Sequence, residues 1–339
     1  MNRMSNNAGV DLAAALWLAH DDYDYVDKPN YISVTTLIKP IRQIILGERV
    51  AKIAMENPEA AIPVDIIDRF KSRLGQSLHT GVEESWKFHY RTSMQKLGYP
   101  KRVIDMVRIN PEHEEPDTLP VYTEQRVERE VRIGTVTYTV GGKIDLIIEG
   151  RLRDVKSTTV YKYTSQKGVG QWLLQGSLYR WLNPRKVHHD EFLVQYLLVD
   201  WTRGFAGRDP KYPPHAAPTR SVRLMGLQET DKWVNDKLRL LTTLKDAPEA
   251  DLPECSEEDL WRSEPIYKYY ADPTKTTGRS TKNFDSEQEA NAFRAEKGKG
   301  IVIAKPGVVK ACGYCPCAPI CGQYQRLLAS GDIASNDNA

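Results

Sequence analysis

The sequence predicts an α/β fold, and three features of the 339-residue chain support this class. Helical patterns occupy residues 33–98, period-two alternation begins at Arg126, and helices alternate with apolar strands after residue 169. The hydrophobic content of 40% and the charged content of 27% suit a soluble globular chain with a core. The order of helix, antiparallel strands, helix and strand therefore describes one α/β domain with additions at both ends.

Charge and hydropathy exclude several other classes. Lys and Arg number 47 and Asp and Glu 45, so the net charge of +2 is neither strongly basic nor strongly acidic. No stretch reaches the roughly 18 consecutive apolar residues that a membrane-spanning helix needs. The N-terminal segment lacks a small-residue cleavage site, so no signal peptide is expected. Membrane, collagen-like and wholly disordered proteins are excluded.

The N-terminal third is expected to be helical. Residues 1–30 end in the acidic, Tyr-rich run DDYDYVD and are expected to form a loosely attached arm. A helix is predicted from Ser33 to about Met55, with Pro40 inside its first turns. A longer helical pattern begins at Pro63 and ends at Gly98, where proline fits a first turn and glycine a C-terminus.

Strands dominate the middle of the chain. Glycine-containing turns separate four predicted short strands, at 126–133, 135–140, 143–148 and 151–156. Further elements are predicted as a helix over 169–182 that stops before Asn183-Pro184, an apolar strand over 191–199, helices near 227–246 and 286–297, and a short strand at 301–304.

The segment GGKIDLIIEGRLRDVKSTT carries the strongest signal for chemistry. Asp145 lies within an apolar strand, where a carboxylate is costly to bury unless it is paired or binds a metal. A tight turn returns the next strand, and its period of two places Asp154 and Lys156 on one face. Two carboxylates can hold Mg²⁺ or Mn²⁺, which activates water, while the lysine stabilises developing charge. An ordinary surface hairpin with an Asp154–Lys156 ion pair is the alternative.

Two further pairs have the i, i+4 spacing of one helix face. His79 and Glu83 form the first pair, and Gln175 and Tyr179, on the helix after the Asp/Lys strand, form the second. Each pair also has an ordinary explanation, a surface pair for the first and core packing with polar capping for the second.

Taken in order, these motifs resemble the RecB-type branch of the PD-(D/E)xK nucleases. The motifs are G-x3-H (Gly75, His79), G-x-I-D (Gly142, Asp145), D-V-K (Asp154, Lys156) and Q-x3-Y (Gln175, Tyr179). The resemblance covers roughly residues 31–200 and the C-terminal cysteines. It implies a restriction-endonuclease-like mixed central sheet flanked by helices, with a helical N-terminal part and a C-terminal cysteine-cluster extension. The domain organisation implied by the resemblance is a nuclease domain over 31–310 with insertions after residue 200, a cysteine cluster over 311–330 packed on the nuclease core, and a flexible tail over 331–339.

The same resemblance implies roles for individual residues. His79, Asp145, Asp154 and the backbone carbonyl of Val155 would bind the metal. Lys156 would be catalytic, together with Asp145 and Asp154. Gln175 and Tyr179 would support the site and contact DNA. Glu83 and Glu130 are further candidates.

The implied activity is a metal-dependent DNA nuclease. The branch includes bacterial recombination nucleases, CRISPR-adaptation nucleases and phage exonucleases, so an exonuclease acting at DNA ends is favoured over an endonuclease. Single- or double-stranded DNA would be the substrate, and a single-strand annealing protein or helicase the partner, because the chain has no GxxxxGK[ST] motif of its own. The alternatives are a catalytically silent DNA-binding or assembly protein on a nuclease fold, and a zinc-stabilised structural protein.

Four of the five cysteines lie in one ten-residue window, as Cys312, Cys315, Cys317 and Cys321. Clustered thiols in a chain without an export signal predict metal ligands in a reducing compartment, here the cytoplasm of a bacterium or of a phage-infected host. A [4Fe–4S] cluster and zinc both suit such thiolates. Branch members with this C-terminal triplet have a fourth cysteine before the histidine motif, which is missing here. The fourth ligand is therefore Cys255, Cys317, a group other than cysteine, or absent.

Basic residues follow the predicted metal site. Between Arg151 and Lys186 there are eight basic residues and one acid, giving +7, with aromatic residues among them. Basic groups contact phosphates and aromatic rings stack on unpaired bases, although a solvated basic face has the same composition. The residues predicted to contact DNA are Arg151, Arg153, Lys162, Lys167 and Tyr179.

Overall fold

The computed structural model describes residues 4–21, 26–57, 64–113, 115–166 and 168–333. The chain forms two compact units, Met1–Lys39 with Glu59–Thr242 (unit one) and Pro40–Pro58 with Thr243–Ala339 (unit two). These bounds differ from the single nuclease domain predicted over 31–310. The reason is a set of contacts between residues distant in the chain, since Arg42 donates hydrogen bonds to the backbone carbonyls of Leu252 and Pro253 at 2.6 and 3.1 Å.

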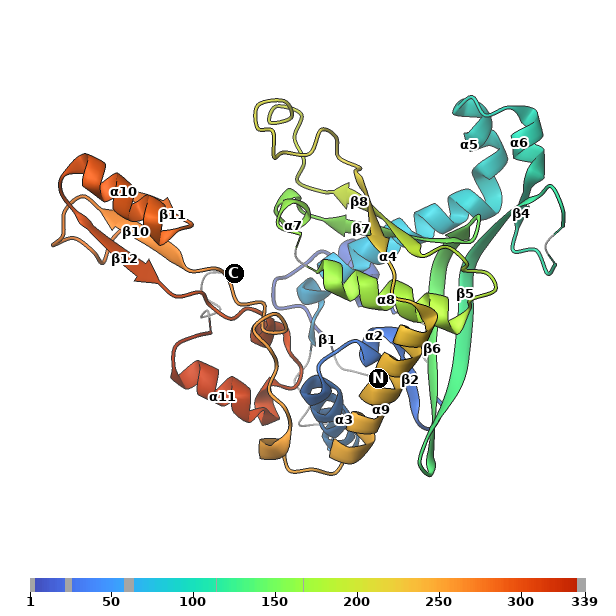
Figure 1. The fold of residues 1–339 in the computed structure, drawn as a ribbon, viewed down its shortest axis with the longest axis horizontal. Helices are drawn as coiled ribbons and strands as arrows, with labels where there is room; N and C mark the ends of the chain where they lie inside the picture. The colour runs from blue at the N-terminus through green and yellow to red at the C-terminus, as the bar shows by residue number, and fades with distance from the viewer. Residues whose placement is uncertain (1–3, 22–25, 58–63, 114, 167, 334–339) are drawn as a thin grey trace. The chain divides into compact units, whose positions relative to one another are not determined.

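Unit one is built on a seven-stranded mixed sheet (Figure 1). Its strands run in the order β4-β5-β6-β7-β8-β9, and β2 pairs with β6. The β5–β6, β6–β7 and β8–β9 pairs are antiparallel, whereas β2–β6, β4–β5 and β7–β8 are parallel. The strands are β2 (Tyr31–Ser33), β4 (Val107–Ile109), β5 (Leu119–Ile133), β6 (Val136–Ile148), β7 (Arg151–Thr158), β8 (Glu191–Leu198) and β9 (Thr219–Arg223). The predicted α/β class, with a mixed central sheet flanked by helices, is confirmed.

Among the helices of unit one, α8 agrees best with the sequence pattern. The helix α8 spans Val169–Leu182 as predicted, and β8 follows the predicted apolar strand. The other helices are α1 (Leu12–Ala19), α2 (Val34–Leu37), α4 (Phe70–Glu84), a π-helix (Ser85–His89), α5 (Tyr90–Lys96), α6 (Lys101–Met106), α7 (Val160–Thr164) and α9 (Leu227–Leu244). Among the described residues, no helix combines the length and apolar character needed to cross a membrane.

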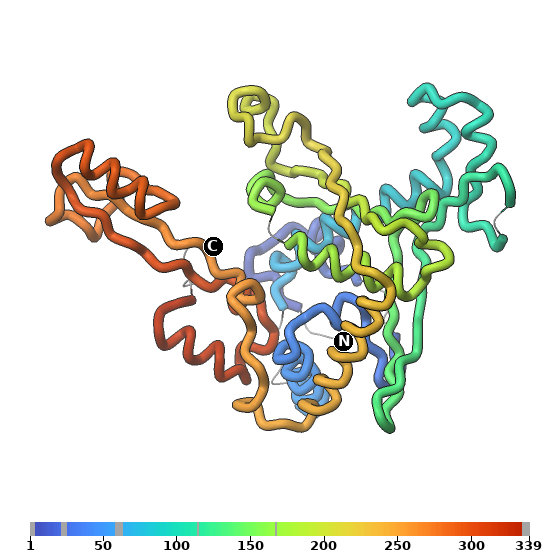
Figure 2. The backbone as a smooth tube through the Cα atoms, in the orientation of Figure 1, coloured from blue at the N-terminus to red at the C-terminus, as the bar shows by residue number. Residues whose placement is uncertain are grey.

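The central strands are longer than predicted. The two strands expected on either side of Gly141-Gly142 are one continuous strand, β6, because β5 pairs with it from Val136 to Ile148. Figure 2 follows the chain through this long β5–β6 hairpin. Two glycines in sequence therefore lie inside a strand here, where they admit neighbouring side chains rather than forming a turn.

The N-terminal region differs from the prediction in two ways. The helix expected from Ser33 is interrupted before Pro40, since α2 ends at Leu37 and α3 (Ile41–Glu56) begins after the proline. The described part of the arm is tied to unit one, because β1 (Met4–Ser5) pairs with β3 (Val64–Asp65), and Arg69 and Arg73 each donate a hydrogen bond of 3.0 Å to carbonyls of α1. Pro63, the predicted helix start, lies outside the described residues, and α4 follows a 3₁₀ turn (Ile66–Arg69).

A two-residue turn joins β6 to β7 and fixes their register. Glu149 and Gly150 both have positive φ, at 52° and 71°, as in the type I′ hairpin turn, and Ile148 pairs with Arg151 directly across it. A Cβ atom at Gly150 would lie 1.9 Å from the ring of His188. Glycine is therefore required here both by the backbone conformation and by the neighbouring ring.

We expect Gly150→Ala to lower the free energy of unfolding by about 2–4 kcal/mol, from backbone strain and the collision with His188. Gly134→Ala is the matched control, because Gly134 also has positive φ but no atom within 4 Å of its would-be Cβ. The free energy of unfolding of the control variant should fall by only about 1 kcal/mol. Urea unfolding of both variants measures the difference, and equal losses would show that the His188 contact contributes nothing.

Unit two combines a helical part with a small three-stranded sheet. The sheet has the order β11-β10-β12, from Lys282–Phe284, Ile266–Tyr270 and Ile301–Lys305. The helices are α3, α10 (Glu287–Lys297), α11 (Gly322–Ala329) and 3₁₀ turns at Glu249–Asp251, Ala311–Tyr314 and Ala318–Ile320. The predicted tail over 331–339 is described only to Ile333, which bridges to Val309.

Candidate active site

The sheet opens at the position of the predicted carboxylates. On the side of β6 opposite β5, β7 pairs with Leu146–Ile148 and β2 pairs with Thr139–Gly141. Residues 142–145 therefore lie between two strand partners. Asp145 and Asp154 are the residues next to the last β6–β7 pair, Leu146 with Arg153. The strands thus separate where these two carboxylates emerge.

The helix α4 brings the predicted histidine to this opening. His79 Nδ1 lies 3.3 Å from Asp145 Oδ2, and His79 Nε2 lies 3.8 Å from Asp154 Oδ1. One ligand atom from each of these three residues lies within 4.8 Å of the others. The ammonium of Lys156 is 2.5 Å from Asp154 Oδ2. Four residues predicted from three separate motifs are therefore brought together.

Asp154 is the most confined group of the set. Its side chain is only 5% exposed, and beyond the Lys156 ion pair neither carboxylate oxygen has a hydrogen-bond partner among the described residues. Burial raises the pKa of Asp154, and the nearby Asp145 charge adds to this, while Lys156 and His79 act in the opposite direction. A buried carboxylate short of donors is a suitable ligand for a cation.

The pKa of Asp145 is shifted in the opposite direction to that of Asp154. Burial raises its pKa, but the hydrogen bond and charge of His79, with the charge of Lys156, outweigh burial, so the pKa of Asp145 is lowered. Asp145 therefore stays ionised and orients the His79 ring. Hard oxygen ligands together with one imidazole suit a divalent cation such as Mn²⁺ or Mg²⁺.

The ion pair between His79 and Asp145 predicts a pH-dependent contribution to the stability of the metal-free protein. The hydrogen bond to Asp145 raises the pKa of His79 above its ordinary value of 6.5, although burial acts against it. Because the folded-state pKa is the higher one, the stabilisation is fully present below the unfolded value and is lost as pH rises through the folded value. We expect wild type to exceed His79→Gln in Tm at about pH 5.5, and the gap to close by about pH 8.5, in chelator. A gap that widens with pH would contradict the assigned pair.

Further groups line the cavity at this site. Val155 and Glu83 line it together with the three ligands, and Glu83 also pairs with Lys87. The carbonyl of Val155 stays a predicted ligand. The side chain of Val155 is half-buried. Glu130, the other candidate, is exposed on β5 across from Thr139 and does not line this cavity, because it lies six positions along the strand from Glu124.

The sequence analysis missed Glu124, a charged residue of this cavity, and did not predict that Arg153, expected to contact DNA, lines the same cavity. Glu124 has a φ of 53° and lies on β5 between the positions that pair with Leu146 and Ile144, hence across from Asp145. It forms an ion pair with Lys143. The missed signal was the hairpin register, which extends β5 upstream of the predicted strand start and sets residue 124 opposite residue 145.

Tyr179 reaches β6, and neither Tyr179 nor Gln175 lines the cavity. The amide of Gln175 donates to the Tyr179 hydroxyl at 3.4 Å. The Tyr179 ring packs on Gly142, where a Cβ atom would lie 2.9 Å from it, and its side chain is 8% exposed. The predicted support of the site is consistent with this position beside β6. The predicted DNA contact of Tyr179 is not, because the ring is buried between helix and strand.

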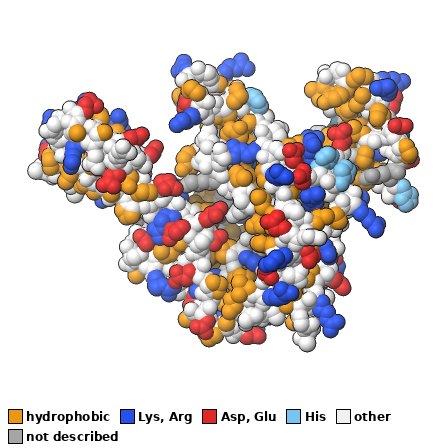
Figure 3. Space-filling view, viewed as in Figure 1, with side chains coloured by type: hydrophobic (Ala, Val, Ile, Leu, Met, Phe, Trp, Pro, Cys, Tyr) orange, Lys and Arg blue, Asp and Glu red, His pale blue; other side chains and the backbone are white. Residues whose placement is uncertain are grey.

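The residues predicted to contact DNA have different settings. Lys162 is exposed on α7, Arg151 lies 3.7 Å from Glu191, and Arg153 is half-buried in the cavity wall. Lys167 lies outside the described residues. On the face drawn in Figure 3, basic side chains are interspersed with acidic ones rather than gathered in one field. Of the described residues predicted to contact DNA, Arg153 is therefore the one that lines the cavity with the carboxylates.

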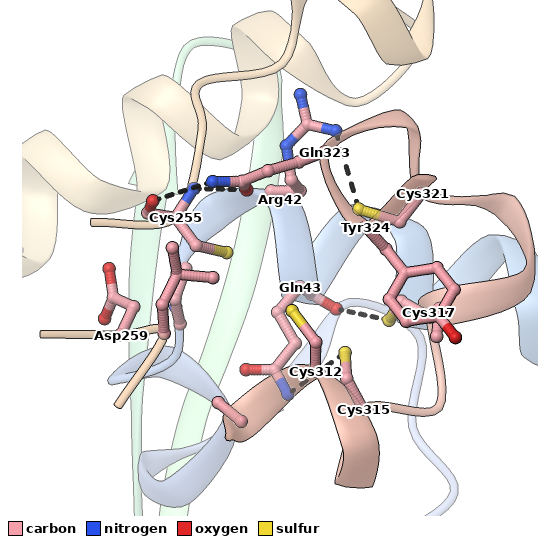
Figure 4. Close-up of a pocket in the computed structure, with 14 residues that line it drawn as sticks. Arg42, Gln43, Cys255, Asp259, Cys312, Cys315, Cys317, Cys321, Gln323 and Tyr324 are labelled. Atoms are coloured by element: carbon pink, nitrogen blue, oxygen red, sulfur yellow. Dashed lines mark hydrogen bonds between the residues drawn. The ribbon is translucent and has the colours of Figure 1, made fainter. Parts of the chain in front are cut away.

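The cysteines belong to unit two. All five cysteines, Cys255, Cys312, Cys315, Cys317 and Cys321, line one cavity that opens to solvent (Figure 4). Burial raises the pKa of the Cys255 thiol to about 12 and also raises that of Cys312. Such thiols need a bound metal to be thiolates at neutral pH. The residues present therefore have the donor chemistry of a thiolate metal site.

Comparisons with known proteins assign no family. No protein-family model and no curated protein sequence matches the chain. Among solved structures, the protein described as "Crystal structure of SSO0001" is 17% identical, covering 66% of this chain and 81% of that chain with a TM-score of 0.37. This similarity is too weak to assign a fold or a function.

Proposed function

We propose that the chain is a metal-dependent DNA nuclease of restriction-endonuclease-like fold, with its catalytic centre at the opening between β6 and β7. The observation that carries the proposal is Asp154, a buried carboxylate whose charge is met among the described residues by the Lys156 ammonium and the His79 ring. It shares a set of ligand atoms within 4.8 Å with His79 and Asp145, and Lys156 lies 2.5 Å away. Perturbed carboxylates that converge with a histidine and a lysine in a cavity are typical of active sites.

His79, Asp145 and Asp154 would hold Mg²⁺ or Mn²⁺, with the carbonyl of Val155 as a further oxygen donor. A bound divalent cation supplies neutralisation of phosphate charge and activation of water. The protein contributes the arrangement of its donors. The ion pair with Asp145 fixes the orientation of the His79 ring, and the β6–β7 turn fixes the spacing of the two carboxylates.

Lys156 would act on the phosphodiester itself. Its ammonium is held beside Asp154 and its side chain is 29% exposed, so a phosphate can reach it from solvent. From this position it can stabilise negative charge that develops on a phosphate oxygen, or orient the attacking water. Arg153, in the cavity wall, offers a second cationic group for a neighbouring phosphate.

The finer assignment to an exonuclease that acts at DNA ends in recombination or repair is supported by the order of the sequence motifs. A single-strand annealing protein or a helicase would supply the accompanying activity in a phage or bacterial pathway. The rival function is a catalytically silent DNA-binding or assembly protein. The convergence of all four site residues favours an enzyme over this rival, because binding alone requires no such arrangement.

The test is digestion of end-labelled linear single- and double-stranded DNA beside a closed circular control, with Mg²⁺, Mn²⁺ or chelator. We expect metal-dependent loss of linear DNA, no loss of the closed circle, and no cleavage by Lys156→Ala. Cleavage of the circle would replace the exonuclease assignment by an endonuclease. Folded, metal-loaded protein that binds DNA without cutting it would establish the DNA-binding rival.

A further inference from the structure

We propose that the segment 85–106 binds the unpaired bases of a DNA strand, with Phe88 and Tyr99 as the rings on which the bases stack. This segment, the α5–α6 projection, consists of the π-helix, α5, α6 and the turn between the two α-helices (Figure 1). The projection holds the strand that the proposed nuclease would cleave, so its role rests on the proposed function.

One face of the projection is fixed to the central sheet. Trp86, Tyr90 and Met94 pack against a buried cluster on β4, β5 and β6. These three residues are spaced by four, and such a row turns by about 40° per step around an ideal α-helix. The wider turn of the π-helix compensates for this rotation, so all three side chains face the sheet. Trp86 also lines the cavity of the carboxylates, so the projection and the cavity share a wall.

The opposite face carries large apolar side chains in solvent. Phe88 lies two residues from both Trp86 and Tyr90, about 200° around the helix from each, and it is 72% exposed. Leu97 and Tyr99, in the turn before α6, are 75% and 51% exposed. Figure 3 shows hydrophobic side chains gathered over α5 and α6. Large apolar side chains that gather on a surface mark an interaction site.

The charge of the projection favours a nucleic acid as the partner. Residues 85–106 contain five basic residues and one acid, giving +4. Three of the basic residues, Lys96, Lys101 and Arg102, are exposed and flank Leu97 and Tyr99 in the chain. Exposed cations next to exposed aromatic rings are the combination that binds single-stranded DNA, because phosphates contact the cations and bases stack on the rings.

The position of Phe88 sets which base it meets. Phe88 follows His79 by nine positions on the continuous helical run of α4 and the π-helix, which corresponds to about 13 Å along the axis. Stacked bases repeat at about 3.4 Å along a strand. A strand that leaves the cavity over Trp86 therefore meets Phe88 about four nucleotides from the phosphate at the carboxylates.

The experiment measures binding of a fluorescent oligodeoxythymidine to wild type, Phe88→Ala and Tyr99→Ala in chelator, where metal-dependent cleavage does not occur. Each variant should bind about tenfold more weakly, because one base–aromatic stack is lost. Trp261→Ala, which removes a ring of similar exposure (54%) from unit two, should bind as wild type does. Unchanged affinity in both variants of the projection would assign the rings to a protein partner and overturn the proposal.

Abasic nucleotides test stacking directly, because they remove a base and keep its phosphate. One abasic nucleotide at the position that meets Phe88 should weaken binding by wild type about tenfold and have no effect on Phe88→Ala. An equal loss in wild type and Phe88→Ala at every position of the strand would overturn the stacking role.

The phosphate contacts are tested by salt dependence. The triple variant Lys96→Ala, Lys101→Ala, Arg102→Ala should lower the slope of log affinity against log salt by about two, since each phosphate contact on a single strand contributes about 0.7. Its sensitivity to abasic nucleotides should stay as in wild type. An unchanged slope would overturn the binding of the strand along this projection.

Photo-cross-linking of wild type keeps the test valid if either alanine variant fails to fold. Iododeoxyuridine is placed along the strand, and the attached peptides are mapped by mass spectrometry. Attachment should fall on Phe88 or Tyr99, and attachment confined to other segments would overturn the proposal. Because binding is measured without cleavage, an inactive chain that binds through Phe88 fails as a nuclease and keeps this site. An active nuclease whose binding is unchanged in both variants loses only this site.

Discussion

Replacement of Asp154 by asparagine is expected to reduce metal-dependent cleavage by at least about 10³-fold. The amide keeps the shape of the side chain but removes the negative charge that a divalent cation requires. The affinity for Mn²⁺ should fall by about tenfold or more. Single-turnover cleavage and Mn²⁺ titration measure these two effects, and Asp236→Asn, an exposed carboxylate on α9, is the control that should change neither.

The same variant should retain or gain stability without metal. Burial raises the pKa of Asp154, so the folded state favours the protonated acid and the ionised carboxylate opposes folding at neutral pH. The free-energy cost of ionised Asp154 in the folded state grows as pH rises from the ordinary pKa of an aspartic acid through its raised folded-state pKa. Asparagine has no charge at any pH, so the variant is free of this cost. We expect the Tm of Asp154→Asn to equal or exceed that of wild type in chelator, by a margin that widens with pH. A large loss of Tm would make Asp154 structural and would weaken the metal-site assignment.

Local signals explain which parts of the fold were predictable. The helix over 169–182 has its start and its Asn183-Pro184 stop within one stretch of sequence, and the structure has the same bounds. The Asp145–Asp154 pair was predictable for a similar reason, since a two-residue turn sets their proximity. Chemistry encoded within about ten residues can therefore be inferred from one sequence.

Contacts between distant residues account for what was not predicted. The assignment of α3 to unit two depends on Arg42 meeting carbonyls more than 200 positions later, and no periodicity contains that information. Likewise, the burial of Tyr179 depends on how α8 lies over Gly142, and the setting of Cys255 depends on Gln323. Sequence therefore identified the chemical groups of the site better than it identified their surroundings.

Lys156→Ala tests whether the lysine acts in the chemical step rather than in binding. Removing one preorganised cation beside the reacting phosphate should lower the cleavage rate by about 10²–10³-fold. DNA affinity should remain close to wild type. Tm should fall at neutral pH although the chain stays folded, because the buried Asp154 carboxylate loses its ion pair with the ammonium. Lys232→Ala, on the exposed surface of α9, removes the same charge and should leave cleavage unchanged.

Salt dependence separates the two roles of this lysine. A residue that only binds phosphate changes the slope of log affinity against log salt by about one when it is removed. We expect no such change for Lys156→Ala, and a loss confined to the cleavage rate at saturating DNA. Lys156→Arg should also remain at least about tenfold slower, because a planar guanidinium cannot occupy the position of a compact ammonium beside Asp154. Full activity in the arginine variant, together with a changed slope in the alanine variant, would assign Lys156 to substrate binding alone.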